Sequence, residues 1–251
     1  MKSKYIICGI ITFLLVVVFL LIYFYSGAEW LKEFSMNVAT EVLGIIITVF
    51  VIDYLIDKKE EDERYKRQAV AIKRMRVPLI HHIHTLFNIF KASIEKEPDK
   101  KYNTLSDLFD DFYFEQIQYL DFSMEAPILP KTNWVNYLYN EFTRFADELK
   151  KVLDTYSLFL DSEIIELLDC ISNSNFLNYV CKIRNIHQID AQLDFKRKYL
   201  MLNGTADLCK EHIEILMKLI DFCNKSLSEA DRIQYNEYLW RAETASETSS
   251  R

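Results

Sequence analysis

Glycine and proline are scarce in this chain. It has four of each among 251 residues, and Gly204 is the only glycine after residue 57. A sheet of many short strands needs turn-forming residues between its strands, so this scarcity disfavours such a sheet. The apolar residues instead recur at spacings of three and four, which is typical of helices.

The motifs of several enzyme classes are also missing. The sequence contains no glycine-rich phosphate loop, no G-x-S-x-G and no H-E-x-x-H. None of its five cysteines forms a C-x-x-C pair, and a cytosolic domain keeps its thiols reduced. We therefore predict a protein that is not an enzyme and that has neither cofactor nor metal. The one histidine cluster is His81, His82 and His84; we expect polar contacts there rather than a metal site, since no carboxylate partner is fixed by the local sequence.

Two long apolar runs occupy the first 57 residues. Residues 5–25 carry no charge and would extend about 30 Å as a helix, enough to cross a bilayer. This run is longer than the apolar region of a signal peptide, so we predict that it is retained. Residues 38–56 form a second run, whose most apolar part lies between Glu41 and Asp53. We predict two transmembrane spans, which together form an anchor of residues 1–57.

Basic residues set the expected orientation of the anchor. Two lysines precede the first run, and residues 58–76 carry eight Lys or Arg against four acids. The 12 residues between the runs carry one lysine and two glutamates. Because basic flanks stay in the cytosol, both termini are expected to be cytosolic.

One face of the second run carries small and polar residues. At helical spacing this face contains Asn37, Thr40, Glu41, Gly44 and Thr48. Small residues at such spacing allow helices to approach closely in lipid, and an acid inside a span needs a partner or water. Two interpretations stay open: Glu41 marks the outer end of the span, or these residues line the interface of a homo-oligomer, which could surround a pore.

The run N-V-A-T-E-V-L-G-I-I-I-T-V-F-V-I-D resembles a pattern in bacterial proteins with two N-terminal spans. Some of these look like membrane effectors of phage-defence systems of the retron, CRISPR or CBASS type. The resemblance is carried by Asn37, Thr40, Glu41, Gly44, Thr48 and Asp53, and it is confined to the membrane anchor. It implies an inner-membrane protein of bacteria, an oligomer, and a role in antiviral defence.

A basic region follows the anchor. Residues 58–96 are predicted to form a juxtamembrane helix region, and their basic residues include Lys58, Lys59, Arg64, Lys66 and Arg67. These side chains could attract anionic lipid headgroups; equally, they could form a solvated helix face with i,i+4 ion pairs. We expect Pro78 to kink or interrupt the helix.

The remaining chain is predicted to be a cytosolic helical bundle, residues 97–241, followed by a disordered tail, residues 242–251. A helix from Thr104 to Phe122 and a long amphipathic helix over residues 133–159 are expected. The apolar residues of the long helix recur at spacings of three or four: Trp134, Leu138, Phe142, Phe145, Leu149, Val152, Tyr156 and Phe159. A shorter helix follows over residues 163–171. Further helices are expected over residues 175–185, 189–202, 206–227 and 229–241. The fold class is therefore all-α, with two N-terminal transmembrane helices before the bundle.

A basic patch lies within this acidic domain. Residues 77–251 carry 19 basic and 28 acidic residues, yet six basic or histidine side chains bracket an expected turn at residues 185–188. These are Lys182, Arg184, His187, Lys196, Arg197 and Lys198. The patch could receive a nucleotide, a nucleic acid or an acidic protein, or it could be an ordinary solvated helix face.

Two functional hypotheses follow from these patterns. In the first, the protein is a membrane effector or signalling module of antiphage defence, whose cytosolic domain senses or docks a partner and whose oligomerised spans perturb the membrane. In the second, it is a membrane-tethered scaffold that recruits a cytosolic enzyme or nucleoprotein and has no conducting state.

Overall fold

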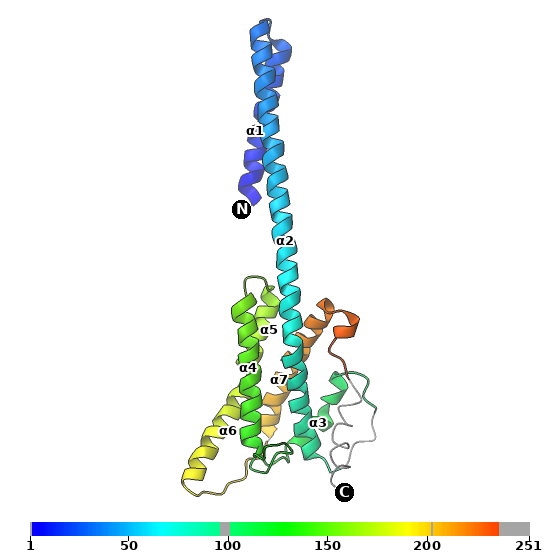
Figure 1. Ribbon diagram of the computed structural model, residues 1–251, viewed down its shortest axis with the longest axis vertical. Helices are drawn as coiled ribbons and strands as arrows, with labels where there is room; N and C mark the ends of the chain where they lie inside the picture. The colour runs from blue at the N-terminus through cyan, green and yellow to red at the C-terminus, as the bar shows by residue number, and fades with distance from the viewer. Residues whose placement is uncertain (1, 96–100, 202, 236–251) are drawn as a thin grey trace. The chain divides into compact units, whose positions relative to one another are not determined.

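The computed structural model describes residues 2–95, 101–201 and 203–235 of the chain (Figure 1). Within these ranges the regular structure is helical and no strand is formed, as the spacing of apolar residues predicted. The chain divides into two compact units, Met1–Arg64 and Tyr65–Arg251, here called the N-terminal and C-terminal units. The predicted disordered tail, 242–251, lies outside the described residues.

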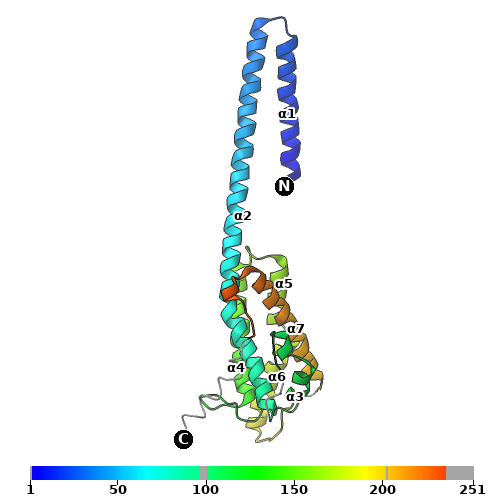
Figure 2. The ribbon, with the colours of Figure 1, turned by 90° about the vertical axis from the view of Figure 1, so that its right-hand side faces the viewer.

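The N-terminal unit contains α1 (Lys2–Tyr25) and the first part of α2 (Glu29–Ser93), which lie side by side and antiparallel (Figures 1 and 2). Only residues 26–28 connect the two helices, so the predicted 12-residue connection is wrong. The amide of Ala28 donates to Ser26 Oγ at 3.2 Å, and the carbonyl of Ala28 accepts from Leu31 and Lys32. The chain therefore re-enters a helix directly.

One helix in the described part of the chain, α2, is long and apolar enough to cross a membrane by its length and composition. Only 6% of its most apolar stretch is buried within the chain, which a soluble core helix would not show. The residues Phe13–Tyr25 of α1 form a shorter apolar helix. These features weakly indicate association with a membrane, and the span predicted over residues 5–25 stays a prediction.

Pro78 does not end α2. The helix continues through it from Glu29 to Ser93, so of the two expectations, a kink or an interruption, the interruption is wrong. A proline removes one hydrogen bond within a helix, but tertiary packing outweighs this cost. Buried apolar side chains on both sides of Pro78 fix the helix against the core: Ile72, Met75, Leu79, Ile83, Leu86 and Phe90.

The C-terminal unit packs further helices around this part of α2. They are the 3₁₀ turn η1 (Ser106–Leu108), α3 (Asp111–Ile117), α4 (Trp134–Tyr156), α5 (Ser162–Ser172), α6 (Asn175–Gln192), α7 (Asn203–Ser226) and η2 (Glu229–Asp231). Asp110, Asn133 and Ser174 cap α3, α4 and α6, because each side chain accepts a hydrogen bond from an amide of the first turn.

The long amphipathic helix is confirmed as α4. Its predicted apolar positions line the core, with Trp134, Leu138, Phe142, Phe145, Leu149 and Val152 all buried. They join one continuous hydrophobic cluster with side chains of α2, α5, α6 and α7. The periodicity predicted the buried face up to Val152, but the helix ends at Tyr156 rather than at residue 159, and Tyr156 and Phe159 are only partly buried.

Three other predicted boundaries are wrong. The chain from Thr104 to Phe122 holds η1 and α3 rather than one helix, and α6 runs unbroken through the turn predicted at residues 185–188. No separate helix forms over the described part of residues 189–202, because residues 189–192 are the end of α6 and the helix stops at Gln192. There Asp194 adopts φ 50° and the Phe195 amide donates to the Asp190 carbonyl at 2.8 Å, a common way to end a helix. The helix predicted over 229–241 is also wrong in its described part, since only the turn η2 forms there and residues 232–235 are not helical; residues 236–241 lie outside the described residues.

Asn224 fixes the extended segment after η2. Its side-chain amide donates to the Ile233 carbonyl at 3.0 Å and accepts from the Ile233 amide at 2.8 Å. Asn224→Ala should therefore lower the free energy of unfolding by about 1–3 kcal/mol, because the amide of the buried Ile233 loses its partner. Urea unfolding of the detergent-solubilised chain, followed by tryptophan fluorescence, measures this. Asn178→Ala, which removes an exposed 3.3 Å bond, is the control and should stay within about 0.5 kcal/mol. An equal effect of both substitutions would contradict the assignment.

Candidate functional site

The small and polar residues of the apolar segment share one exposed face of α2. We call Asn37, Thr40, Glu41, Gly44 and Thr48 the small-residue face; all five are exposed. A shallow hollow of about 410 Å³ lies along it, lined by Glu41, Gly44, Ile45, Thr48 and Val49. A methyl group added at Gly44 would meet nothing within 4 Å, so this face is open to close approach by another helix.

The opposite face of α2 is the one that packs within the N-terminal unit. Ser35 and Ala39 are buried there, as is Val16 of α1. At about 100° per residue, Ser35 and Ala39 lie roughly opposite Gly44. The small-residue face is therefore left unpartnered by the pairing of α1 with α2.

Glu41 is the polar group that this arrangement leaves exposed among apolar residues. The hydroxyls of Thr40 and Thr48 donate to the carbonyls of Met36 and Gly44, each at 2.8 Å, so both are satisfied inside the helix. Glu41 has no hydrogen-bond or ion-pair partner among the residues that the structure describes. In lipid such a carboxyl group requires a partner from outside the unit, or water.

The predicted juxtamembrane cations belong to both units. Lys58, Lys59 and Arg64 lie in the N-terminal unit, and Lys66 and Arg67 lie in the C-terminal unit. All five are exposed, but the guanidinium group of Arg67 stacks on the ring of Phe159 at 4.5 Å. Arg67 thus contributes to the packing of the bundle, and the lysines are available to solvent or headgroups.

The structure brings only part of the predicted basic patch together. His187, Lys196 and Arg197 line a hollow of about 300 Å³ beside Ser123 and Tyr199. The guanidinium group of Arg184 instead lies over the ring of Tyr139 at 3.9 Å, and its buried Nε has no partner. Lys182 and Lys198 are exposed outside this hollow. Because α6 continues through residues 185–188, the patch follows one helix and the turn after it rather than bracketing a turn.

A buried carboxylate that the sequence did not single out organises this hollow. Asp190 accepts from Arg197 Nε at 2.8 Å and Nη2 at 3.2 Å, and from the hydroxyl of Tyr199. Burial, followed by the hydrogen bond to Asp190, raises the pKa of Tyr199 to about 12. His187 pairs with Asn133 at 3.1 Å. Arg197 is thus neutralised, and Lys196 remains as the free cation of this hollow among the described residues.

The histidine cluster separates into one core residue and two exposed ones. His81 and His84 are exposed, whereas His82 is buried and stacks on Phe145 with ring centroids 3.8 Å apart. His82 Nε2 lies 2.7 Å from His212 Nε2, and His212 Nδ1 lies 2.7 Å from Ser174 Oγ. Within the described residues no group of three or more His, Cys, Asp or Glu side chains could hold a metal ion.

The side chains of Ser174, His212 and His82, which contact one another in this order, are part of the core. Burial, with a smaller effect of His212, lowers the pKa of His82 well below 6.5, and burial lowers the pKa of His212 to about 3. Both rings are therefore neutral near pH 7. Although a serine beside a histidine resembles a nucleophile with its base, the Ser174 hydroxyl is buried and already caps α6. The three side chains connect α2, α6 and α7 instead.

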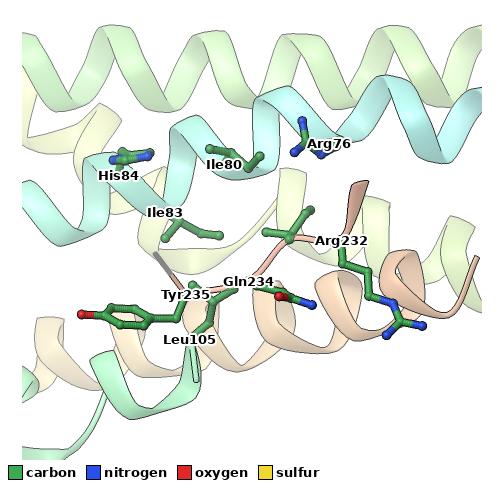
Figure 3. A pocket seen from close by; sticks show the side chains of 9 residues that line it. Arg76, Ile80, Ile83, His84, Leu105, Arg232, Gln234 and Tyr235 are labelled. Carbon is green, nitrogen blue, oxygen red and sulfur yellow. The ribbon is translucent and has the colours of Figure 1, made fainter. Parts of the chain in front are cut away.

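A further hollow of about 280 Å³ lies between α2 and the extended segment after η2 (Figure 3). In Figure 3, Ile80 and Ile83 point from α2 toward this segment, while Arg232 extends away from them. Arg76 donates from Nε to the Asp231 carbonyl at 2.6 Å. The two arginines thus do not surround a common point, and this hollow adds no anion site.

Comparisons with known proteins identify no relative. No family model, no curated protein and no solved structure matches this chain. The two surfaces described above, the small-residue face on α2 and the basic hollow at the end of α6, therefore stand on their own chemistry.

Proposed function

We propose that this chain is a membrane effector or signalling protein of bacterial antiphage defence, anchored in the inner membrane by two spans with both termini in the cytosol. Its C-terminal unit senses or docks a partner, and its spans associate with those of other copies and perturb the bilayer. The observation that carries the proposal is the exposed small-residue face, with Glu41 unpartnered beside Gly44 and Thr48. The role in defence rests on the resemblance of the anchor alone.

The physical argument concerns what lipid does to such a face. Between helices in a bilayer the hydrophobic effect supplies no driving force, so association depends on close packing and on polar contacts. Gly44 permits close packing, and Glu41 requires a polar contact. Further copies of the chain satisfy both, since each copy presents the same face.

The course of α2 supports a route for signalling. The helix is continuous from Glu29 to Ser93 and contributes side chains to the core of the C-terminal unit. A partner that favours one packing of this core over another would bias the apolar segment through the same helix. The basic residues Lys58, Lys59 and Lys66 along it are suited to anionic headgroups.

The second candidate function is a membrane-tethered scaffold without a conducting state. It is favoured by the basic hollow at the end of α6, lined by His187, Lys196 and Arg197, which suits recruitment of an acidic protein. Replacing residues 1–57 with an unrelated two-span anchor separates the two functions: a scaffold keeps its activity after the exchange, and an effector that acts through α2 loses it.

Membrane potential in cells induced to express the chain tests the first function. The wild type should depolarise the cells, and Glu41→Ala should lose most of this effect at equal expression, because the polar contact between copies is removed. Glu33→Ala is the matched control, since Glu33 is an exposed acid of α2 outside the apolar run. It should behave as the wild type does. Depolarisation that survives Glu41→Ala would refute the proposed role of the small-residue face. A wild type that leaves the potential unchanged would leave either the scaffold or an effector whose trigger is missing from these cells.

A further inference from the structure

The end of α6 exposes a stripe of large apolar side chains. Ile186, Ile189 and Leu193 follow one another at spacings of three and four, so they share a face of the helix. Phe195 lies two residues after Leu193. Ile189 is 54% exposed, Leu193 72% and Phe195 57%. Single exposed apolar residues are ordinary, but a contiguous group of this kind marks an interaction site.

The stripe lies on a side of α6 that the helical bundle leaves exposed. The first half of α6 buries Phe176, Leu177, Val180 and Ile183 in the bundle, whereas Asp190 is the only buried residue in its second half. At about 100° per residue, Ile186, Ile189 and Leu193 lie more than about 100° around the helix from the centre of the face that the four buried apolar side chains form. They therefore form a second apolar face of α6, which the bundle leaves exposed.

Cations surround the stripe in a domain that is otherwise acidic. Lys182 begins the exposed face one turn before Ile186, and Lys196 and Lys198 follow Phe195. Residues 182–198 carry five Lys or Arg and two acids, of which Asp190 is buried against Arg197. Residues 77–251 as a whole have an excess of acids, 28 against 19 basic residues. The local charge is thus opposite to that of the surrounding domain.

The hollow beside Phe195 supplies a place for an acidic group. Phe195, Lys196 and Arg197 line it together with His187. Asp190 already occupies the guanidinium group of Arg197, which leaves the Lys196 ammonium group to pair with an incoming carboxylate. An ion pair next to an apolar contact sets the orientation of a partner more than it adds affinity.

We propose that this surface, made of Lys182, Ile186, Ile189, Leu193, Phe195, Lys196 and Lys198, docks an acidic amphipathic helix of a partner protein. Its apolar residues would lie on the stripe, in the i, i+3, i+7 manner by which helices bind apolar surfaces, and its acids would meet the lysines at the edge. This inference rests on the proposed function in that it identifies where the C-terminal unit docks its partner.

Two synthetic helical peptides test the docking surface. They share one apolar face of leucines, and their polar faces carry glutamate in one and lysine in the other. Binding to the full chain in zwitterionic nanodiscs, with empty nanodiscs as background, is followed by fluorescence anisotropy. We expect the glutamate peptide to bind and the lysine peptide not to bind. Ile189→Ser should weaken binding at least about tenfold, as expected for an anchor residue at the centre of an interface.

Charge reversal and a matched control complete the experiment. Lys196→Glu combined with Lys198→Glu should weaken the binding of the glutamate peptide and remove most of the salt dependence of this binding. Leu158→Ser is the control, since Leu158 is an exposed apolar residue away from this surface, and it should bind as the wild type does. Equal binding of both peptides, no binding of the glutamate peptide, or unchanged binding by Ile189→Ser would each overturn the proposal. The readout is binding alone, so a chain that depolarises cells without binding the peptide would refute this inference and keep the proposed function.

Discussion

Gly44→Leu is expected to reduce self-association of the full chain in a bilayer by at least about tenfold, which corresponds to about 1.4 kcal/mol. The leucine side chain would occupy the space into which a second helix must fit, and overpacking of a close contact costs about 1–3 kcal/mol. Energy transfer between differently labelled chains in liposomes, measured over a series of protein-to-lipid ratios, gives the association directly.

The position of Gly44 in the structure makes this substitution suitable for testing association between copies. Because an added Cβ at Gly44 contacts nothing within 4 Å, the substitution begins in open space, on the side of α2 away from Ser35 and Ala39, which pack within the N-terminal unit. Gly44→Ala should give an intermediate loss. Leu43→Phe, about 100° around the helix and also exposed, enlarges a neighbouring position and should leave association unchanged.

The same series tests the geometry of the interface. If Gly44→Leu and Leu43→Phe reduced energy transfer equally, the contact would not be centred on the small-residue face. If neither did, α2 would anchor the chain without bringing copies together, which is the behaviour expected of the scaffold.

The second large effect is a loss of stability in acid. The pKa of His212 in the folded chain is about 3, and that of His82 lies well below its unfolded value of 6.5. Below pH 6.5 these two histidines therefore bind protons in the unfolded chain but stay unprotonated in the folded core. The free energy of unfolding is unaffected by these two groups above that pH. It should fall by up to about 1.4 kcal/mol per pH unit for each histidine as the pH drops from 6.5 toward the folded pKa values.

The surroundings of the two rings explain why protonation is costly. His82 lies between Phe142 and Phe145, and His212 faces Phe176 as well. Neither imidazole contacts a carboxylate in the described residues, and two charged rings whose Nε2 atoms are 2.7 Å apart would repel each other. Acid should thus separate the part of α2 in the C-terminal unit from α6 and α7.

Urea unfolding of the detergent-solubilised chain at several pH values between 8 and 5, followed by tryptophan fluorescence, measures this dependence. His212→Asn should lower stability at pH 8, where Ser174 loses its partner, by about 1–3 kcal/mol, and should also flatten the pH slope. His81→Asn is the control, because His81 precedes His82 directly in the sequence but is exposed. A slope that is the same in the wild type and in His212→Asn would show that other groups cause the acid sensitivity.

Local pattern was enough to predict several features of this chain. The spacing of Trp134, Leu138, Phe142, Phe145 and Leu149 predicted the buried face of α4, and the low glycine and proline content predicted a helical chain. The small-residue face also followed from spacing alone, since residues four apart on a helix share a side.

Helix boundaries were predicted less well, because they depend on competing energies of similar size. Pro78 costs α2 a hydrogen bond, and only the burial of residues on both sides of it decides that the helix continues. The predicted turn at residues 185–188 contains no glycine or proline, and α6 continues through it until the left-handed conformation of Asp194 ends it.

The sequence by itself determined that this chain is helical, that an apolar segment near its N-terminus is long enough for a membrane, and that small and polar residues share one face of that segment. Tertiary structure decided which polar groups meet. His82 and His212 are 130 residues apart, and Asn133 and His187 are 54 apart, so no local pattern brings them together. Only the folded core also determines which apolar residues of α6 are buried and which are exposed, because burial depends on the helices that pack against it.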